Sequence, residues 1–168
     1  MTKTVTEIQN IVNQLAERIN APKYLLPTFS SPIGDATPNI EVDNLGLYNY
    51  VISERGEEYE RKITSDLNDL LYWIFASVTF SMACDYELKN RIDEKDFRRI
   101  MFAKQEDLLG VLNKDWKEKE RKGHQSILNN NPFDDLAGLR ATYCRELREK
   151  GLSESEIQKI AYEKYPER

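Results

Sequence analysis

The segment DLNDLLYWIFASVTFSMACDYELKNR, residues 66–91, decides the fold. At about 100° per residue, its apolar side chains spread over nearly the whole circumference of a helix. Those on the broadest face are Leu67, Leu70, Leu71, Ile74, Phe75, Val78 and Met82. The interspersed Asp, Ser, Thr and Cys make the segment too polar for a membrane span, which needs about 20 mostly apolar residues. We therefore predict a central core helix that is buried among several neighbours.

One charged residue, Asp85, interrupts the apolar face of this helix. A lone charge is costly to bury. Either the helix bends before Asp85 or a cation meets it, and the candidate cations are Arg61, Arg91 and Arg98. We favour a buried structural ion pair over a catalytic acid at this position.

The residues before this helix predict a small antiparallel sheet at about residues 40–64. A short strand at 40–42 precedes a hairpin of residues 47–54 and 57–64. The fold class is therefore α+β, with this meander packed on a helical bundle centred on helix 66–91.

The separation of apolar from charged side chains sets the expected register of the hairpin. Ile52 is expected opposite Tyr59, across an even-numbered turn in which Gly56 takes a positive φ. One face then packs on the central helix and the other faces water. The expected wet face carries Asn49, Val51, Ser53, Glu58, Glu60 and Lys62.

The N-terminal residues predict a helix followed by a loop. Thr4 and Glu7 have the spacing of a capping box, and the helix is expected from about residue 5 to residue 20, where Pro22 ends it. Residues 21–39 contain four prolines, so we expect a loop that wraps the domain. Its apolar side chains should pin it to the core; they are Tyr24, Leu25, Leu26 and Phe29.

Further helices follow the central one. An apolar stripe predicts a helix that opens at Asp93 or Asp96, and a polar helix follows over residues 115–130. Residues 134–168 then predict a helical hairpin: Asp135 starts its first helix, Gly151 closes it, and Ser153 with Glu156 forms a capping box for the second. We predict a single α+β domain over residues 1–131 and a C-terminal helical hairpin, 132–168, that packs on it or forms an appendage.

Composition points to a cytoplasmic protein that acts on a protein partner. The 168-residue chain has a formal net charge of −5, which disfavours nucleic acid and suits a basic partner. No secretory signal is evident at the N-terminus, and the widely spaced Cys84 and Cys144 are expected as reduced thiols. We expect no nucleic acid or membrane partner, and a monomer or homodimer.

The sequence offers no recognisable catalytic or metal-binding set. A triad needs a base, and the single histidine, His124, lies in a polar segment that predicts a solvated side chain. One histidine and two cysteines fall short of the four ligands of a structural zinc site. No P-loop or glycine-rich dinucleotide motif occurs. We expect no catalytic residue, no cofactor and no metal.

Several motifs follow one another between the hairpin and residue 118. In chain order they are Glu54-Arg55-Gly56, Glu60-Arg61, Thr64-x-Asp66, Leu70-Leu71-Tyr72-Trp73-Ile74-Phe75, Ala83-x-x-Tyr86-Glu87-Leu88-x-x-Arg91, Asp96-Phe97-Arg98-Arg99, Phe102 and Gln105. In this order, over roughly residues 40–118, they resemble the immunity protein 63 family of bacterial polymorphic toxin systems. The resemblance implies an α+β protein, encoded beside a toxin gene, that neutralises the cognate toxin by binding it.

Neutralisation by binding needs a complementary surface and no chemistry of its own. Many toxins of such systems attack nucleic acids through basic clefts, so the resemblance implies a basic toxin as partner. Our hypothesis for the toxin-binding surface is the wet hairpin face with two aromatic loop residues: Glu54, Arg55, Glu57, Glu58, Glu60, Tyr24 and Phe29. Two alternatives stay open, a non-catalytic helical adaptor or regulator that acts through residues 134–168, and a hydrolase with a carboxylate-bound metal near Asp66.

Overall fold

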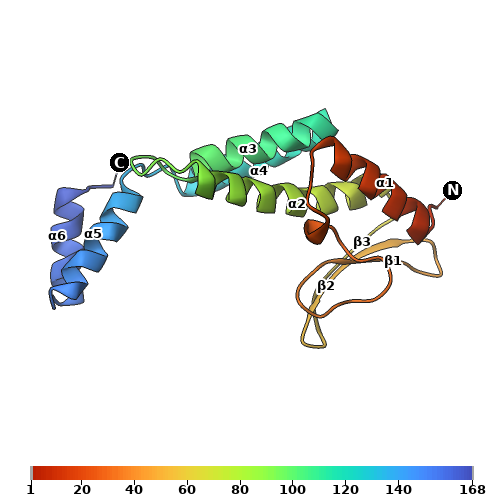
Figure 1. Cartoon of the computed structure of the whole chain (residues 1–168), viewed down its shortest axis with the longest axis horizontal. Coiled ribbons are helices and arrows are strands. Elements are labelled where there is room, and N and C mark those ends of the chain that lie inside the picture. Colours follow the sequence, from red (N-terminus) through yellow and green to blue (C-terminus); the bar gives the residue numbers. More distant parts are fainter. Residues whose placement is uncertain (1, 168) are drawn as a thin grey trace. The chain divides into compact units, whose positions relative to one another are not determined.

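The computed structural model describes residues 2–167 and confirms the α+β class (Figure 1). Six α-helices and one three-stranded sheet make up the described part of the chain. The helices are α1 (Val5–Arg18), α2 (Leu67–Lys89), α3 (Arg98–Leu112), α4 (Lys114–Asn130), α5 (Ala137–Glu149) and α6 (Glu154–Lys164). The strands are β1 (Asn39–Val42), β2 (Tyr48–Glu54) and β3 (Glu57–Thr64), and a 3-10 turn, η1, spans Lys23–Leu25.

Contacts divide the chain into two compact units. Unit 1 comprises residues 1–82 and 105–120, and unit 2 comprises residues 83–104 and 121–168. The division crosses α2, α3 and α4, so each of these helices contributes residues to both units. The predicted boundary at residue 131 stays a prediction.

Unit 1 is built around one continuous apolar cluster. It takes buried side chains from α1, β1, β2, α2, α3 and α4, with Phe75 of α2 fully buried and stacked on Trp116 of α4 at a centroid distance of 6.1 Å. The predicted capping box of α1 is confirmed, with Thr4 accepting from the Glu7 amide. Of the loop residues expected to pin residues 21–39, Leu25, Leu26 and Phe29 pack on this core. Tyr24 does not, because it is 74% exposed.

The sheet is an antiparallel meander in the order β1-β2-β3. Its hairpin turns at Arg55 and Gly56, whose φ angles are 52° and 85°, as a type I′ turn requires. The predicted two-residue turn is therefore confirmed, and Ser53 pairs with Glu58 as that turn dictates.

Beyond the turn, the predicted register is wrong by one residue. A β-bulge between Ile52 and Ser53 leaves Tyr59 unpaired, and Ile52 pairs with Glu60 instead. The bulge places Glu60 and Lys62 opposite the apolar residues of β2, and it turns Arg61 to the polar face. Charged residues on the core face are tolerated because β3 is an edge strand. There Glu60 and Lys62 pair with each other at 3.1 Å, and their side chains stay about 42% exposed.

Helix α2 begins one residue after Asp66, whose carboxylate accepts a hydrogen bond from the Asn68 amide and so caps the helix. The expectation that this segment is too polar for a membrane span is wrong by length and composition alone, because α2 passes that test, as core helices of water-soluble proteins also do. Its residues Leu70, Ile74 and Val78 are buried in the unit 1 core.

The predicted buried ion pair of Asp85 is wrong, because Asp85 lies exposed on α2. The apolar face of α2 serves the unit 1 core only as far as Met82, and from Ala83 onward a different face is buried in unit 2. There Glu87 is the buried acid, 3% exposed, and Arg91 holds it with two hydrogen bonds of 2.8 and 2.7 Å. The other two candidate cations also have different partners, Asp96 for Arg98 and Glu58 for Arg61.

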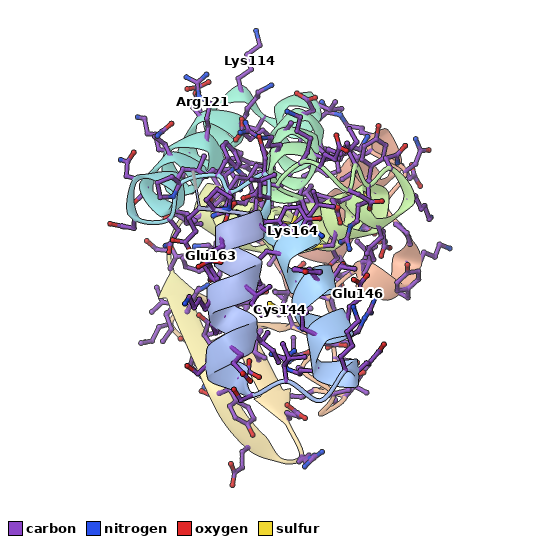
Figure 2. The ribbon with its side chains drawn as sticks, turned by 90° about the vertical axis from the view of Figure 1, so that its left-hand side faces the viewer. Lys114, Arg121, Cys144, Glu146, Glu163 and Lys164 are labelled. Atoms are coloured by element: carbon purple, nitrogen blue, oxygen red, sulfur yellow. The ribbon has the colours of Figure 1, made fainter. Side chains whose placement is uncertain are left out.

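Unit 2 contains the α5–α6 hairpin. Its predicted start at Asp135 is wrong, because α5 begins at Ala137 with Leu136 as N-cap, and Asp135 pairs with Arg99. The other predicted features are confirmed. Gly151 closes α5 with a φ of 80°, and Ser153 and Glu156 form the capping box of α6. Cys144 packs between the two helices against Ile157 and Ala161, as Figure 2 shows for the labelled cysteine. Cys84 and Cys144 are both free thiols.

The prediction of a solvated His124 is wrong. Its side chain is 5% exposed and stacks on Phe102 of α3, with ring centroids 3.9 Å apart and planes within 6°. The imidazole is therefore a packing element of unit 2.

Candidate functional site

The polar face of the sheet is organised by one side chain, that of Arg61 on β3. Its guanidinium donates to both carboxylate oxygens of Glu58 at 2.9 and 2.7 Å. It also donates to Glu41 on β1 at 3.1 Å and to Asn49 on β2 at 3.0 Å. We call this set, Glu41, Asn49, Glu58 and Arg61, the Arg61 clamp. It ties all three strands together on one face.

The clamp also fixes the charge state of its members. The hydrogen bonds from Arg61 hold the pKa of Glu58 below its usual value, and the bonds to Glu58 and Glu41 raise the pKa of Arg61. Val51 pairs with Arg61, so the two side chains share this face, and Val51 is 2% exposed. The face predicted to be wet is therefore covered at its centre and polar at its rim.

The turn of the hairpin presents further charges next to the clamp. Figure 1 shows the β2–β3 turn lying away from α1 and α2. Arg55 and Glu57 are exposed there, while Glu54 is half-exposed and lies 3.7 Å from Arg55. The loop segment Gly34–Ala36 braces this turn. The Ala36 amide donates to Ser53, and the Arg55 amide donates to Gly34, each at 3.0 Å. We call Glu54, Arg55 and Glu57 the hairpin tip.

The structure brings together only part of the predicted toxin-binding set. Glu54, Arg55, Glu57 and Glu58 lie together at the tip and clamp. Glu60 lies on the other face, paired with Lys62.

The two aromatic loop residues are not among those braced against the hairpin. Phe29 is half-buried and lines a surface groove of about 760 Å³ beside α1, while Tyr24 stands exposed on η1.

Sequence reasoning missed three exposed apolar side chains in this region. Ile63 lies on the clamp face and is 53% exposed, and the bulge residue Tyr59 is 64% exposed. Ile33, next to the brace at Gly34, is 65% exposed. The exposure of Tyr59 and Ile63 could not be predicted, because the register expected from the sequence placed both side chains on the core face. Apolar and aromatic side chains inside a charged rim are typical of protein-binding surfaces.

A second concave region of unit 1 lies between the sheet and α2. Its volume is about 370 Å³, and its lining includes Tyr50, Tyr72, Trp73, Phe80, Gln105 and Glu120, which we call the aromatic hollow. Within it, Tyr72 donates to Glu120 at 2.8 Å, and Gln105 donates to the same carboxylate at 3.3 Å. Burial and this bond to Glu120 raise the pKa of Tyr72, so its hydroxyl stays a donor.

The clamp, the hairpin tip and the aromatic hollow are suited to contacts with a partner rather than to metal chemistry. Among residues 2–167, no group of three or more His, Cys, Asp or Glu side chains is placed to hold a metal ion. Asp66, the residue of the metal alternative, acts as a helix cap by accepting from the Asn68 amide.

The sequence comparisons match the part of the chain that contains the hairpin tip and the aromatic hollow. The family model of Immunity protein 63 matches residues 43–126, which is half of the chain. The hairpin tip and the aromatic hollow lie inside the match, whereas α1 and the α5–α6 hairpin lie outside it. No curated protein and no solved structure matched the chain significantly.

Proposed function

The chain belongs to the immunity protein 63 family, and we propose that it neutralises a cognate toxin by binding it directly through the Arg61 clamp and the hairpin tip. Toxin neutralisation in this proposal is non-catalytic and takes place in the cytoplasm of the producing cell. The partner is a toxin with a basic surface.

The Arg61 clamp is the observation that carries this proposal. A surface that is already ordered before the partner arrives loses less conformational entropy on binding. The bidentate pair with Glu58 and the bonds to Glu41 and Asn49 hold those side chains in one arrangement. Arg61 is in this sense a positioning residue for the acidic rim.

Charge supports a basic partner for the same surface. The chain carries a net charge of −5, and the tip and clamp contribute Glu41, Glu54, Glu57 and Glu58 against Arg55 and Arg61. Complementary charge raises the rate of encounter and selects against wrong partners, while exposed apolar side chains such as Tyr59 supply contact area.

Charge reversal at the tip tests the proposal. The probe is the toxin domain encoded by the neighbouring gene, in an inactivated form, and the measurement is its association rate and affinity at low and high salt. We expect Glu57→Lys to slow association by about tenfold at low salt and by less at high salt. The matched control is Glu94→Lys, an exposed residue of unit 2 that changes the net charge equally.

Two results would overturn the proposal. The first is a wild-type chain that does not bind the toxin of its neighbouring gene. The second, which would remove the tip from the interface, is an equal effect of Glu57→Lys and Glu94→Lys.

A further inference from the structure

We propose that the loop of residues 28–39, which we call the brace loop, forms a second part of the toxin-binding surface, with Ile33 as its apolar contact. The inference rests on the proposed function and adds the chemistry of the partner at this point, which is an apolar recess of the toxin bordered by basic side chains. The brace loop belongs to unit 1, as the hairpin tip does.

The base of the brace loop is closed by hydrogen bonds. The Thr28 amide donates to the Pro38 carbonyl at 2.8 Å, and the Ile40 amide donates to the Thr28 carbonyl at 2.9 Å. The Thr28 hydroxyl also donates, at 2.8 Å, to the side chain of Asn39, which is 1% exposed. Compact surface loops whose ends meet in this way are Ω-loops, and such loops are frequently functional.

The far end of the brace loop is fixed to the hairpin turn. Strand β1 pairs with β2 only over Tyr48–Val51, and beyond it Asp35 pairs with Glu54 as an isolated antiparallel bridge. The Ala36 and Arg55 amides make the two 3.0 Å bonds of the brace. Ala36 has a φ of 67°, a left-handed conformation that is costly for a non-glycine residue and persists only where its surroundings hold it. The loop is therefore ordered before a partner arrives, which lowers the entropy lost on binding.

The brace loop presents an apolar side chain next to acidic ones. Ile33 is 65% exposed and directly precedes the brace. Residues paired across antiparallel strands have Cβ atoms about 5 Å apart, so the side chains of Asp35 and Glu54 are neighbours. Hydrogen bonds from the Thr37 hydroxyl and amide lower the pKa of Asp35, so its carboxyl group is ionised at neutral pH. Within residues 2–167, Asp35 forms no ion pair.

These side chains define the partner that fits. With Asp35 included, the hairpin tip carries three carboxylates, those of Asp35, Glu54 and Glu57, against the single cation Arg55. This balance favours basic side chains on the facing toxin surface and disfavours acidic ones. An exposed aliphatic side chain beside charged groups resembles the apolar centre and polar rim of a protein interface. Ile33 therefore suits an apolar recess with a basic border.

The family match separates the brace loop from the tip that it touches. Residues 43–126 match the family model, so the tip lies inside the match and the brace loop lies outside it. Specificity is a difference of affinities between partners, and it can come from contacts added to a shared surface. The brace loop supplies such a contact at the edge of the tip.

The affinity of the full chain for the inactivated toxin domain of the neighbouring gene tests the inference. Ile33→Ala should raise the Kd by about tenfold, mainly through faster dissociation. Leu45→Ala is the matched control, because Leu45 is 85% exposed in the β1–β2 turn, at the other end of the sheet. It should leave the Kd within about twofold of wild type. Both residues are exposed, so the urea midpoint of either variant should equal that of wild type.

The charge of the loop is tested separately. Asp35→Asn keeps an oxygen acceptor for the Thr37 amide but removes the negative charge. It should slow toxin association by about threefold at low salt and by less at high salt. Asp93→Asn, an exposed change in unit 2, should leave the association rate unchanged.

Amide hydrogen exchange of the free chain tests the brace without any toxin. The Ala36 and Arg55 amides should exchange at least about tenfold more slowly than in an unstructured peptide, because both are hydrogen-bonded. Exchange of both amides at the unstructured rate would show that the brace does not form in solution, and the inference would fall whatever the toxin does.

The toxin measurements separate this inference from the proposed function. If wild type binds the toxin and Ile33→Ala binds it as tightly, or if Ile33→Ala and Leu45→Ala lose affinity equally, the brace loop lies outside the interface. Neutralisation through the clamp and the hairpin tip would still stand, provided that Glu57→Lys weakens binding. If wild type does not bind the toxin at all, both the proposed function and this inference are wrong.

Discussion

Unit 1 and unit 2 are stabilised by different kinds of contact. Unit 1 has one apolar cluster, which includes fully buried Ile8, Leu70, Phe75 and Leu109. Unit 2 has two small clusters among its described residues, one of four buried residues centred on Ile157 and one of three that includes Phe102. With so little apolar area, unit 2 must gain more of its stability from polar contacts.

Those polar contacts converge where the α5–α6 hairpin meets the start of α3. Asp96 is 6% exposed and accepts from the Arg98 side chain and from the Asp134 amide. Arg99 pairs with Asp135, and Arg140, 5% exposed, pairs with Asp134 and donates to the Tyr165 carbonyl. We call these residues the charge network. Unit 1, with its apolar core, carries the proposed binding surface, whereas unit 2, with its charge network, lies mainly outside the family match.

The largest expected effect is in the unit 1 core. Phe75→Ala should lower the free energy of unfolding by about 3–5 kcal/mol, because Phe75 is fully buried against Trp116. Phe80→Ala is the matched control on the same helix, 47% exposed, with an expected change of about 0.5 kcal/mol. Urea denaturation followed by tryptophan fluorescence measures both. Similar losses for the two variants would contradict the assignment of the core.

A smaller effect is expected in the charge network of unit 2. Asp96→Asn removes a buried carboxylate that Arg98 and two backbone amides bind, and it should destabilise unit 2 by about 2 kcal/mol. Amide hydrogen exchange should speed up in α5 and α6 and stay unchanged around Phe75. Asp93→Asn, an exposed change in the same loop, is the control. Exchange that increases equally in both units would show that the two units do not differ in this way.

Features set by neighbouring residues could be predicted from the sequence. The capping boxes at Thr4 and Ser153 need only a residue three positions later, and the glycine at position 56 indicates the hairpin turn. The hairpin register was lost at Tyr59, because a bulge on an edge strand depends on how the backbone twists and not on the pattern of side chains.

Features set by distant residues could not be predicted. The burial of His124 depends on Phe102 in another helix, and the exposure of Asp85 depends on the change of core after Met82. The candidate site followed the same rule. Acidic residues of the hairpin tip are visible in the sequence, but the aromatic hollow joins residues from Tyr50 to Glu120 and has no local signal.

The last prediction concerns stability at low pH, for which the expected difference between the two units is smallest. Hydrogen bonds from Arg99 and from the Asp96 amide lower the pKa of Asp135 from 3.8 to about 2. Burial raises the pKa of Asp96, but its bonds with Arg98 and the backbone outweigh burial and lower it overall. A carboxyl with a lowered pKa stabilises the fold at pH above its unfolded value, and this stabilisation is lost as the pH falls through the folded value.

Protection of the α5 and α6 amides should therefore decline as the pH falls from about 4 to about 2, the range between the unfolded and folded pKa of Asp135. In unit 1, hydrogen bonds from Lys3 and Thr4 lower the pKa of Glu7 to about 2 as well, but α1 is also anchored by buried Ile8 and Val12. The Trp116 indole should keep its protection over this range. Asp135→Asn should reduce the acid-dependent loss in unit 2, and Asp93→Asn should leave it unchanged. An equal loss in the Asp135→Asn variant and the wild type would mean that this carboxylate does not support the hairpin, and that apolar contacts around Ile157 suffice in unit 2 as well.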